Sequence, residues 1–258
     1  MSDAAAPSAK AVEVEVFPNA PVTEAILGIE VPFLDDLTIY VERFHSAIKE
    51  LFPEREAIEA PDADEIQWLS ERSHYRTSRK GEPAGFRLLS ADKRQVVQIT
   101  RRGLTYHRLR PYGDWGHFTE VAVPVWSAFA AVFAPECIAS LRLRYLNRIE
   151  VPLPVGDLSD YLTMLPQVPQ PVDTGFTAYL MRITLWDPHL KAHADVTQIA
   201  QPADDVPLLP VIFDIDVRSN VEITSDERVL WRSVEGLREY KNRIFFSSIT
   251  AATRALFR

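Results

Sequence analysis

The sequence is poor in glycine, and its few glycines are scattered. It holds 9 Gly against 19 Pro among 258 residues, whereas proteins on average use roughly 7% Gly and 5% Pro. Neither G-x-G-x-x-G nor G-x-x-x-x-G-K-[ST] occurs, and these are the glycine patterns that lay backbone against a phosphate. The sequence therefore gives no support for a Rossmann or P-loop nucleotide site.

Cysteine and long apolar runs are also scarce. Cys137 is the only cysteine, which excludes a disulfide within the chain and any zinc or iron–sulfur site held by several cysteines. No run approaches the ~18 apolar residues of a membrane-spanning helix. The Ala-, Ser- and Pro-rich stretch 1–10 has no apolar centre, so we expect a tail there and not a signal peptide. The expectation is a cytoplasmic protein that makes no membrane contact.

The remaining composition is that of an ordinary globular protein with an acidic balance. The chain is 47% hydrophobic and 25% charged, with a formal net charge of −8. Within it, residues 87–110 carry seven Lys or Arg and a single acid, Asp92. This basic segment suits phosphate or a carboxylate ligand, or it forms the polar edge of a hairpin. Because phosphate binders generally are basic across the domain, the overall charge disfavours nucleic acid as the partner.

In the first half, apolar periodicity predicts a strand over 25–31 and then a helix with Asp35 as its N-cap. Strands follow at 85–90 and 95–109, and Gly103 marks a turn or bulge in the second of them. An apolar helix is expected over 119–134. Its regular part should begin near residue 123, because Pro124 is tolerated only in a first turn or at a kink.

The second half opens with a predicted strand over 140–151 and a short helix that begins at Asp157. Further strands are expected at the ranges 177–186, 192–200 and 210–218. A long C-terminal helix should begin near residue 226, with Ser225 as its N-cap.

The two halves repeat one local pattern. Residues 29–32 and 149–152 both read Ile-Glu-Val-Pro, and each is followed by Asp-Leu-x-x-Tyr. We therefore predict an α+β fold with two sequence-similar halves, each strand–helix–strands–helix, in which antiparallel-rich sheets are backed by helices. A single mixed sheet is the alternative. Residues 1–16 are assigned to a disordered tail, 17–139 to the first half and 140–258 to the second, the halves forming one compact unit.

Period-2 alternation gives each strand of the second half one polar row. If these strands share a sheet, one face gathers seven candidate ligand-binding residues: Arg142, Arg144, Arg148, Arg182, Trp186, Asp214 and Asp216. One interpretation is a solvated face whose opposite charges pair across strands. The other is a groove that binds an anionic or mixed-charge ligand through bidentate arginines.

The sequence assigns no catalytic residue, no metal site and no cofactor. Asp214 and Asp216 project the same way and would suit a metal together with other ligands, but no supporting Asp/His cluster is evident. His189 and His193 are four apart, yet the Glu of H-E-x-x-H is absent. No G-x-S-x-G nucleophile elbow occurs either.

Four features of the sequence belong together: the N-x-P-x-x-E-A pattern over 19–25, Tyr112 with Trp115, the R-Y-x-N-R-I pattern over 144–149, and residues 242–250. With them the chain resembles a sporadically distributed, uncharacterised prokaryotic family of about this length. The resemblance implies a prokaryotic cytoplasmic protein and implies no activity, so no catalytic role follows from it. From the residues themselves we predict a structural polar network of Asn19, Glu24 and Asn147. A buried amide such as that of Asn147 needs hydrogen-bond partners.

Three hypotheses about function result. The leading one is a non-enzymatic binding or accessory protein, regulatory or associated with defence, that presents an Arg/Asp-rich sheet face to a small anionic ligand or a protein partner. The second is an enzyme in which Asp214, Asp216 or a His works as acid or base while arginines hold an anion. The third is nucleic-acid binding through residues 87–110. Association with further copies of the chain is left open.

Overall fold

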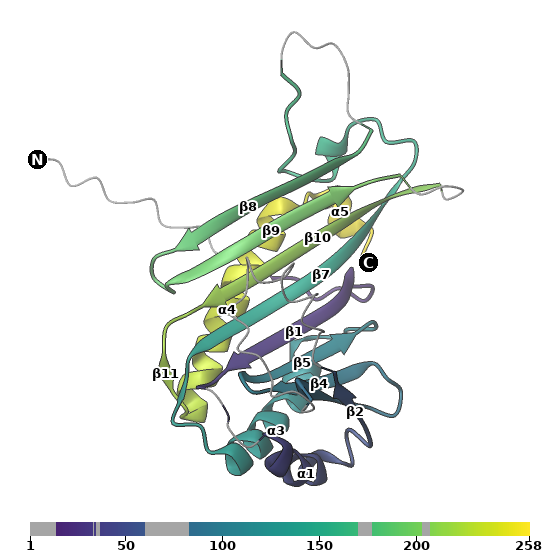
Figure 1. The fold of residues 1–258 in the computed structure, drawn as a ribbon. Coiled ribbons are helices and arrows are strands. Elements are labelled where there is room, and N and C mark those ends of the chain that lie inside the picture. Colours follow the sequence, from purple (N-terminus) through teal and green to yellow (C-terminus); the bar gives the residue numbers. More distant parts are fainter. Residues whose placement is uncertain (1–13, 33, 35–36, 60–82, 170–176, 203–206) are drawn as a thin grey trace, which may run out of the picture.

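The computed structural model of the chain describes residues 14–32, 34, 37–59, 83–169, 177–202 and 207–258 (Figure 1). The fold is mixed α+β, as the sequence predicts. A single nine-stranded sheet runs in the order β2-β3-β4-β5-β1-β7-β10-β9-β8, and each neighbouring pair in it is antiparallel. The two sheets of the leading prediction are therefore one continuous sheet.

The strands of the first half are β1 (Val22–Glu30), β2 (Glu54–Ile58), β3 (Gly85–Leu89), β4 (Gln95–Thr100) and β5 (Gly103–Leu109). Helix α1 (Leu37–Ile48) lies between β1 and β2, and α3 (Trp115–Phe133) closes this half. The strands of the second half are β7 (Ser140–Pro152), β8 (Tyr179–Asp187), β9 (Ala192–Ala200) and β10 (Leu208–Ser219).

Three helices complete the second half: the short 3-10 helix η1 (Leu158–Asp160), the long α4 (Glu227–Ser248) and α5 (Ala251–Ala255). A separate two-stranded pairing joins β6 (Cys137–Ile138) to β11 (Ile223–Thr224). Among the described residues, no helix combines the length and apolar composition needed to cross a bilayer.

The two halves join where β1 pairs with β7 at the middle of the sheet. Leu27 lies opposite Tyr106 on β5 and opposite Leu143 on β7, and all three side chains are buried. They belong to one row that crosses the sheet on the side covered by helices. The alternate residues of the same strands project to the other side, because successive side chains of a strand point to opposite faces.

Helices α3 and α4 cover the apolar side of the sheet. Phe118 of α3 packs against Tyr106 with ring centroids 4.9 Å apart, and Phe245 of α4 packs against Phe213 of β10 at 5.9 Å. Helix α1 joins this layer through Phe44, whose ring lies 6.0 Å from that of Phe129 in α3. The core is continuous from α1 to α5, and it leaves the other face of the sheet to the polar rows.

Three sequence expectations need correction. Helix α3 begins at Trp115 with Asp114 as N-cap and holds Pro124 in its interior, so the predicted start near 123 is wrong. The N-cap of α4 is Asp226, whose carboxylate accepts from the backbone of Arg228 and Val229, and not Ser225. Strand β2 was not predicted. The predicted N-cap Asp35 and the tail up to residue 13 lie outside the described residues.

Candidate functional site

The polar rows of β1, β7, β8, β9 and β10 form one surface, here called the charged face. One row runs from Thr184 through Asp195 and Asp216 to Arg144 in direct cross-strand register. The next row runs from Trp186 through His193 and Arg218 to Arg142. The charged face is defined by ten residues: Glu24, Arg142, Arg144, Arg182, Trp186, His193, Asp195, Asp214, Asp216 and Arg218.

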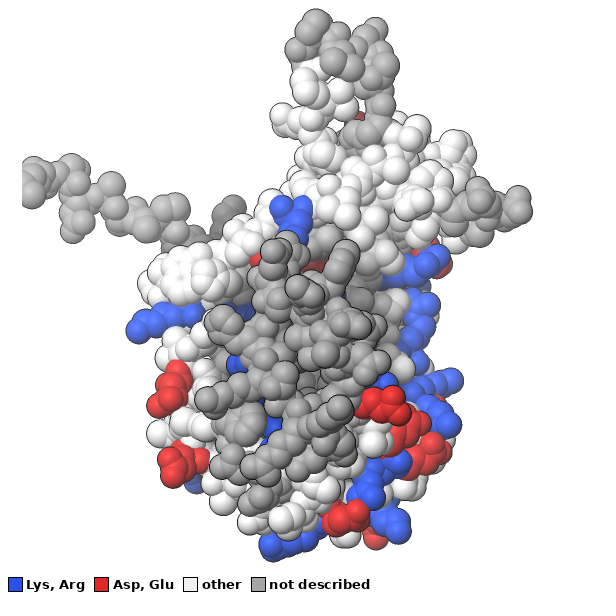
Figure 2. All heavy atoms as spheres, in the orientation of Figure 1, with Lys and Arg blue, Asp and Glu red and all other residues white. Residues whose placement is uncertain are grey.

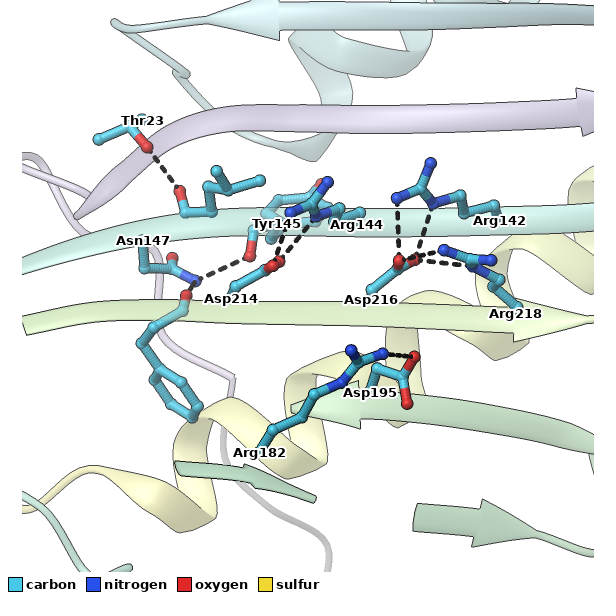
Figure 3. Close-up of polar contacts among 12 residues, drawn as sticks. Thr23, Arg142, Arg144, Tyr145, Asn147, Arg182, Asp195, Asp214, Asp216 and Arg218 are labelled. Atoms are coloured by element: carbon cyan, nitrogen blue, oxygen red, sulfur yellow. Dashed lines mark hydrogen bonds and ion pairs between the residues drawn. The ribbon is translucent and has the colours of Figure 1, made fainter. Parts of the chain in front are cut away.

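Strands β7 and β10 hold two bidentate ion pairs on this face (Figure 3). Nε and Nη2 of Arg142 donate to the two carboxylate oxygens of Asp216 at 2.8 and 2.9 Å. Nε and Nη2 of Arg144 donate to Asp214 at 2.9 and 2.7 Å. Each pair is diagonal, because Arg144 lies directly opposite Asp216 but binds Asp214. Bidentate charge-assisted bonds fix both the position and the orientation of the guanidinium.

Asp216 is the centre of the charged face. Its side chain is only 7% exposed, and Nη2 of Arg218 donates to it at 2.7 Å in addition to Arg142. Burial raises the pKa of Asp216, but the hydrogen bonds from Arg142 and Arg218 outweigh it, so the net pKa is lowered. Asp216 is therefore an ionised carboxylate at neutral pH, with both oxygens engaged.

A second cluster lies toward the sheet edge, on β8 and β9. Asp195 accepts from Nη2 of Arg182 at 2.7 Å and from the hydroxyl of Thr184 at 2.6 Å. The hydrogen bond from Thr184 is the largest cause of the lowered pKa of Asp195, and burial opposes it. Beside this cluster, Trp186 is 52% exposed, and its ring lies 4.4 Å from that of His193. The edge of the charged face therefore carries an exposed aromatic ring packed against a histidine.

The acids lie deeper than the arginines that bind them. Asp214 and Asp216 have side chains 17% and 7% exposed, whereas their partners Arg144 and Arg142 are both 31% exposed and Arg218 is 50% exposed. The bonds to Asp214 and Asp216 use only Nε and Nη2 of the three arginines. No described residue accepts from Nη1 of Arg142, Arg144 or Arg218. What the charged face offers outward is an array of guanidinium donors.

Glu24 closes the charged face on β1. Its carboxylate contacts Nδ1 of His107 at 2.7 Å, and this bond, opposed by burial, is the main cause of its lowered pKa. Nearby, a Cβ on Gly28 would lie 3.3 Å from Cβ of Arg142. The missing side chain of Gly28 thus leaves room for the Arg142 stem beside β1.

Three predicted residues lie outside these pairs. Arg148 binds Glu150 through Nε at 3.1 Å, toward one end of the sheet. Asn147 is buried on the helix side, where Nδ2 donates to the carbonyl of Phe213 at 3.0 Å. Asn19 donates from Nδ2 to the carbonyl of Arg258 at 3.2 Å. The structure therefore does not join Asn19, Glu24 and Asn147 into one network; each has partners of its own.

Sequence reasoning missed Asp195 as a site residue and left Arg218 out of the candidate set. The signal for both was available, because Asp195 occupies the polar row of 192–200 and Arg218 continues that of Asp214 and Asp216. Within the described part of the chain, no group of three or more His, Cys, Asp or Glu side chains is placed to hold a metal ion.

No family model matches the chain, and no curated protein matches it in sequence.

Proposed function

We propose that this chain is a cytoplasmic, non-enzymatic binding protein whose charged face docks a carboxylate-rich surface of a protein partner. The observation that supports this most is the layering of the charged face: buried carboxylates hold the arginines in place, and Nη1 of Arg142, Arg144 and Arg218 has no acceptor among the described residues. Because the ion pairs form within the sheet itself, the donors are oriented before a partner arrives. Such preorganisation lowers the entropic cost of association.

The size of the charged face favours a protein over a small ligand. It spans the five adjacent strands from β1 to β8, and strands about 4.8 Å apart make this roughly 19 Å. Trp186 stands half exposed in the same row as Arg218, with His193 between them. Tryptophan and arginine are the residues most enriched at the energetic centres of protein interfaces. A row that holds both residue types suits an anchor for a macromolecular partner.

The geometry speaks against Asp214 and Asp216 as an acid/base pair. Both oxygens of each carboxylate accept from an arginine, and the pKa of Asp216 is lowered, burial being outweighed by Arg142 and Arg218. A general base works best with a pKa near the operating pH. Because the arginines already occupy the oxygens of both aspartates, these ion pairs fit a binding role better than acid/base catalysis.

The basic segment 87–110 does not form one stripe for nucleic acid. Lys93 and Arg94 lie in the turn between β3 and β4, whereas Arg101 and Arg102 lie in the turn at the opposite end of β4. Lys93 and Arg102 also pair with Glu54 and Glu30. In Figure 2, blue and red atoms lie side by side at the lower right. This mixture of charges speaks against a nucleic-acid interface through residues 87–110.

We also infer that the fold is a duplicated strand–helix–strands–helix unit. The order β1-β5-β4-β3 in the first half corresponds to β7-β10-β9-β8 in the second. The two Ile-Glu-Val-Pro segments support this, because each falls at the C-terminal end of its strand, one at the end of β1 and the other at the end of β7. The charged face then belongs mainly to the second unit.

The proposed function is tested by titrating a fluorescently labelled deca-glutamate peptide into the protein. We expect saturable binding that weakens as salt increases, and no binding of a deca-lysine peptide. The double variant Arg182→Gln/Arg218→Gln should bind roughly tenfold more weakly, because two outward donors are lost. Arg43→Gln/Arg232→Gln, which removes two exposed arginines outside the charged face, is the matched control. Equal affinities of the two double variants would overturn the proposal.

A further inference from the structure

A cleft of about 380 Å³ opens at the end of the sheet where β1 begins and where β5 and β7 end. Segments far apart in the sequence line it: residues 18–21, residues 110–113, two residues of β7 and two near the C-terminus. Its volume lies in the lower part of the ~300–1,000 Å³ range of small-molecule sites. The motifs over 19–25 and 144–149, which the sequence analysis singled out, both contribute residues to this cleft.

Backbone hydrogen bonds fix the walls of the cleft. The amide of Arg148 donates to the carbonyl of Pro21 at 2.8 Å, and that of Arg110 donates to Thr23 at 3.0 Å. The amide of Asn19 donates to the carbonyl of Phe257 at 3.0 Å. Because these bonds tie four segments together, the cleft has its shape before any ligand binds.

Five residues of the cleft lining, three prolines and two aromatic residues, form an apolar and rigid part of its wall. Pro18, Pro21 and Pro111 have little conformational freedom to lose, and Phe257 and Tyr112 add aromatic surface. The hydroxyl of Tyr112 is held by that of Tyr145 at 2.6 Å, so its ring is fixed in place. These side chains suit the apolar body of a small molecule.

The ionisable groups of the lining leave one positive charge uncompensated. Arg110 is exposed, and its side chain forms no hydrogen bond or ion pair with any residue that the structure describes. Arg148 donates through Nε to Glu150 at 3.1 Å, and no described residue accepts from its Nη atoms. Two arginines against the single carboxylate of Glu150 give the lining a formal charge of +1, which matches a monoanion.

We propose that this cleft binds a small organic carboxylate, with the anionic group held by Arg110 and Arg148 and the apolar body packed against Pro111, Tyr112 and Phe257. Guanidinium groups are the preferred partners of carboxylates because their donors match the two oxygens. The apolar walls and the single net charge select a carboxylate with a hydrocarbon body over free inorganic phosphate. The site is separate from the charged face, since none of these five residues belongs to it.

Isothermal titration with phenylacetate and hexanoate tests the proposal. We expect saturable binding of at least one of them at a single site, and none of phenylacetamide, hexanamide or inorganic phosphate. Arg110→Gln should weaken binding by roughly tenfold or more, the usual effect of losing one charged hydrogen-bond donor. The midpoint of thermal unfolding of the Arg110→Gln variant should equal that of the unaltered protein, because the side chain of Arg110 has no partner among the described residues. Arg43→Gln, on the exposed side of α1, should bind like the unaltered protein.

A second variant separates binding from folding. Arg148→Lys keeps a positive charge beside Glu150 but loses the forked donors, so it should also weaken phenylacetate binding while the protein stays folded. The proposal is overturned if neither carboxylate binds, if an amide or phosphate binds as well as its carboxylate counterpart, or if Arg110→Gln binds with unaltered affinity. A crystal structure with phenylacetate must place its carboxylate within hydrogen-bond distance of Arg110.

Discussion

At the scale of single residues, Asp216 shows how a buried charge is kept in this protein. Its carboxylate is 7% exposed and accepts from Arg142 and Arg218. Desolvation of an ionised group is costly, and here it is offset by a bidentate bond and a second guanidinium. Removing the charge would leave two arginines without their counter-ion.

Asp216→Asn should therefore destabilise the fold by about 2–3 kcal/mol, somewhat below the ~3–5 kcal/mol for breaking a fully buried pair, because Arg218 is half exposed. Glu150→Gln, which breaks the exposed pair with Arg148, is the matched control and should cost less than ~1 kcal/mol. Urea denaturation measures both values. Similar losses for the two variants would show that Asp216 has no central role in the sheet.

Lys241 on α4 is a second unusual residue. Its Nζ lies 3.9 Å from the centroid of the Tyr145 ring, and no described carboxylate pairs with it. Burial, and to a smaller extent the charge of Arg238, lowers the pKa of Lys241 to about 7 from 10.5. Between these two pH values the unfolded chain binds a proton that the folded chain does not, so stability should rise with pH.

The free energy of unfolding should increase by more than about 1 kcal/mol between pH 7 and pH 9.5. Above about pH 10 the trend should reverse, because burial raises the pKa of Tyr112 to about 12 and the unfolded tyrosine ionises first. Lys241→Met removes the titrating group and should flatten the rise. Urea denaturation at half-unit pH steps gives both curves, and parallel curves for the variant and the unaltered protein would contradict the lowered pKa.

At the scale of secondary structure, the turn between β4 and β5 depends on Gly103. Its φ is +130°, and a Cβ there would lie 2.1 Å from the carbonyl oxygen of Ile29. The paired strand β1 thus comes very close to the start of β5 through the carbonyl of Ile29. Only glycine fits this combination of backbone conformation and close approach.

Gly103→Ala should destabilise the protein by more than about 2 kcal/mol, because strain and a backbone clash act together. Gly156→Ala is the control, since a Cβ at Gly156 would meet nothing within 4 Å, and it should change stability by less than ~0.5 kcal/mol. Denaturant titration of the two variants compares them. A small effect at Gly103 would mean that β1 can move away from the turn.

Strands with strict alternation could be predicted from the sequence almost to the residue. Residues 192–200 were expected as a strand and form β9 over the same range, because buried and more exposed side chains alternate along all of it. Strand β2 was missed because its first four residues, Glu54–Ala57, are all exposed, so no apolar period marks it. Helix α3 begins earlier than predicted because Asp114 caps it and the helix continues through Pro124, which the prediction had placed in the first turn.

The site was predictable to the same extent as the strands. Alternation placed Arg142, Arg144, Asp214 and Asp216 on one face, and the structure brings them together in two ion pairs. The diagonal pairing could not be predicted from the sequence, because it depends on the register between β7 and β10. The cleft could not be predicted for a related reason: residues 18–21 and 110–113 meet only when β1 pairs with both β5 and β7.

At the scale of the whole molecule, the sheet separates two environments. One side packs against α3 and α4 and supplies the core, and the other carries the ion pairs of the charged face (Figures 1 and 3). We propose that the charged face docks a partner that brings carboxylates, and this is the central claim.

Photo-crosslinking in the source cell tests this claim most directly. With benzoylphenylalanine in place of Trp186, we expect one discrete protein adduct that mass spectrometry identifies repeatedly. The adduct should be lost when Arg182→Glu and Arg218→Glu are added, and it should be absent with the probe at the exposed Ile39 of α1. No adduct at position 186, or an adduct that survives both charge reversals, would contradict the account.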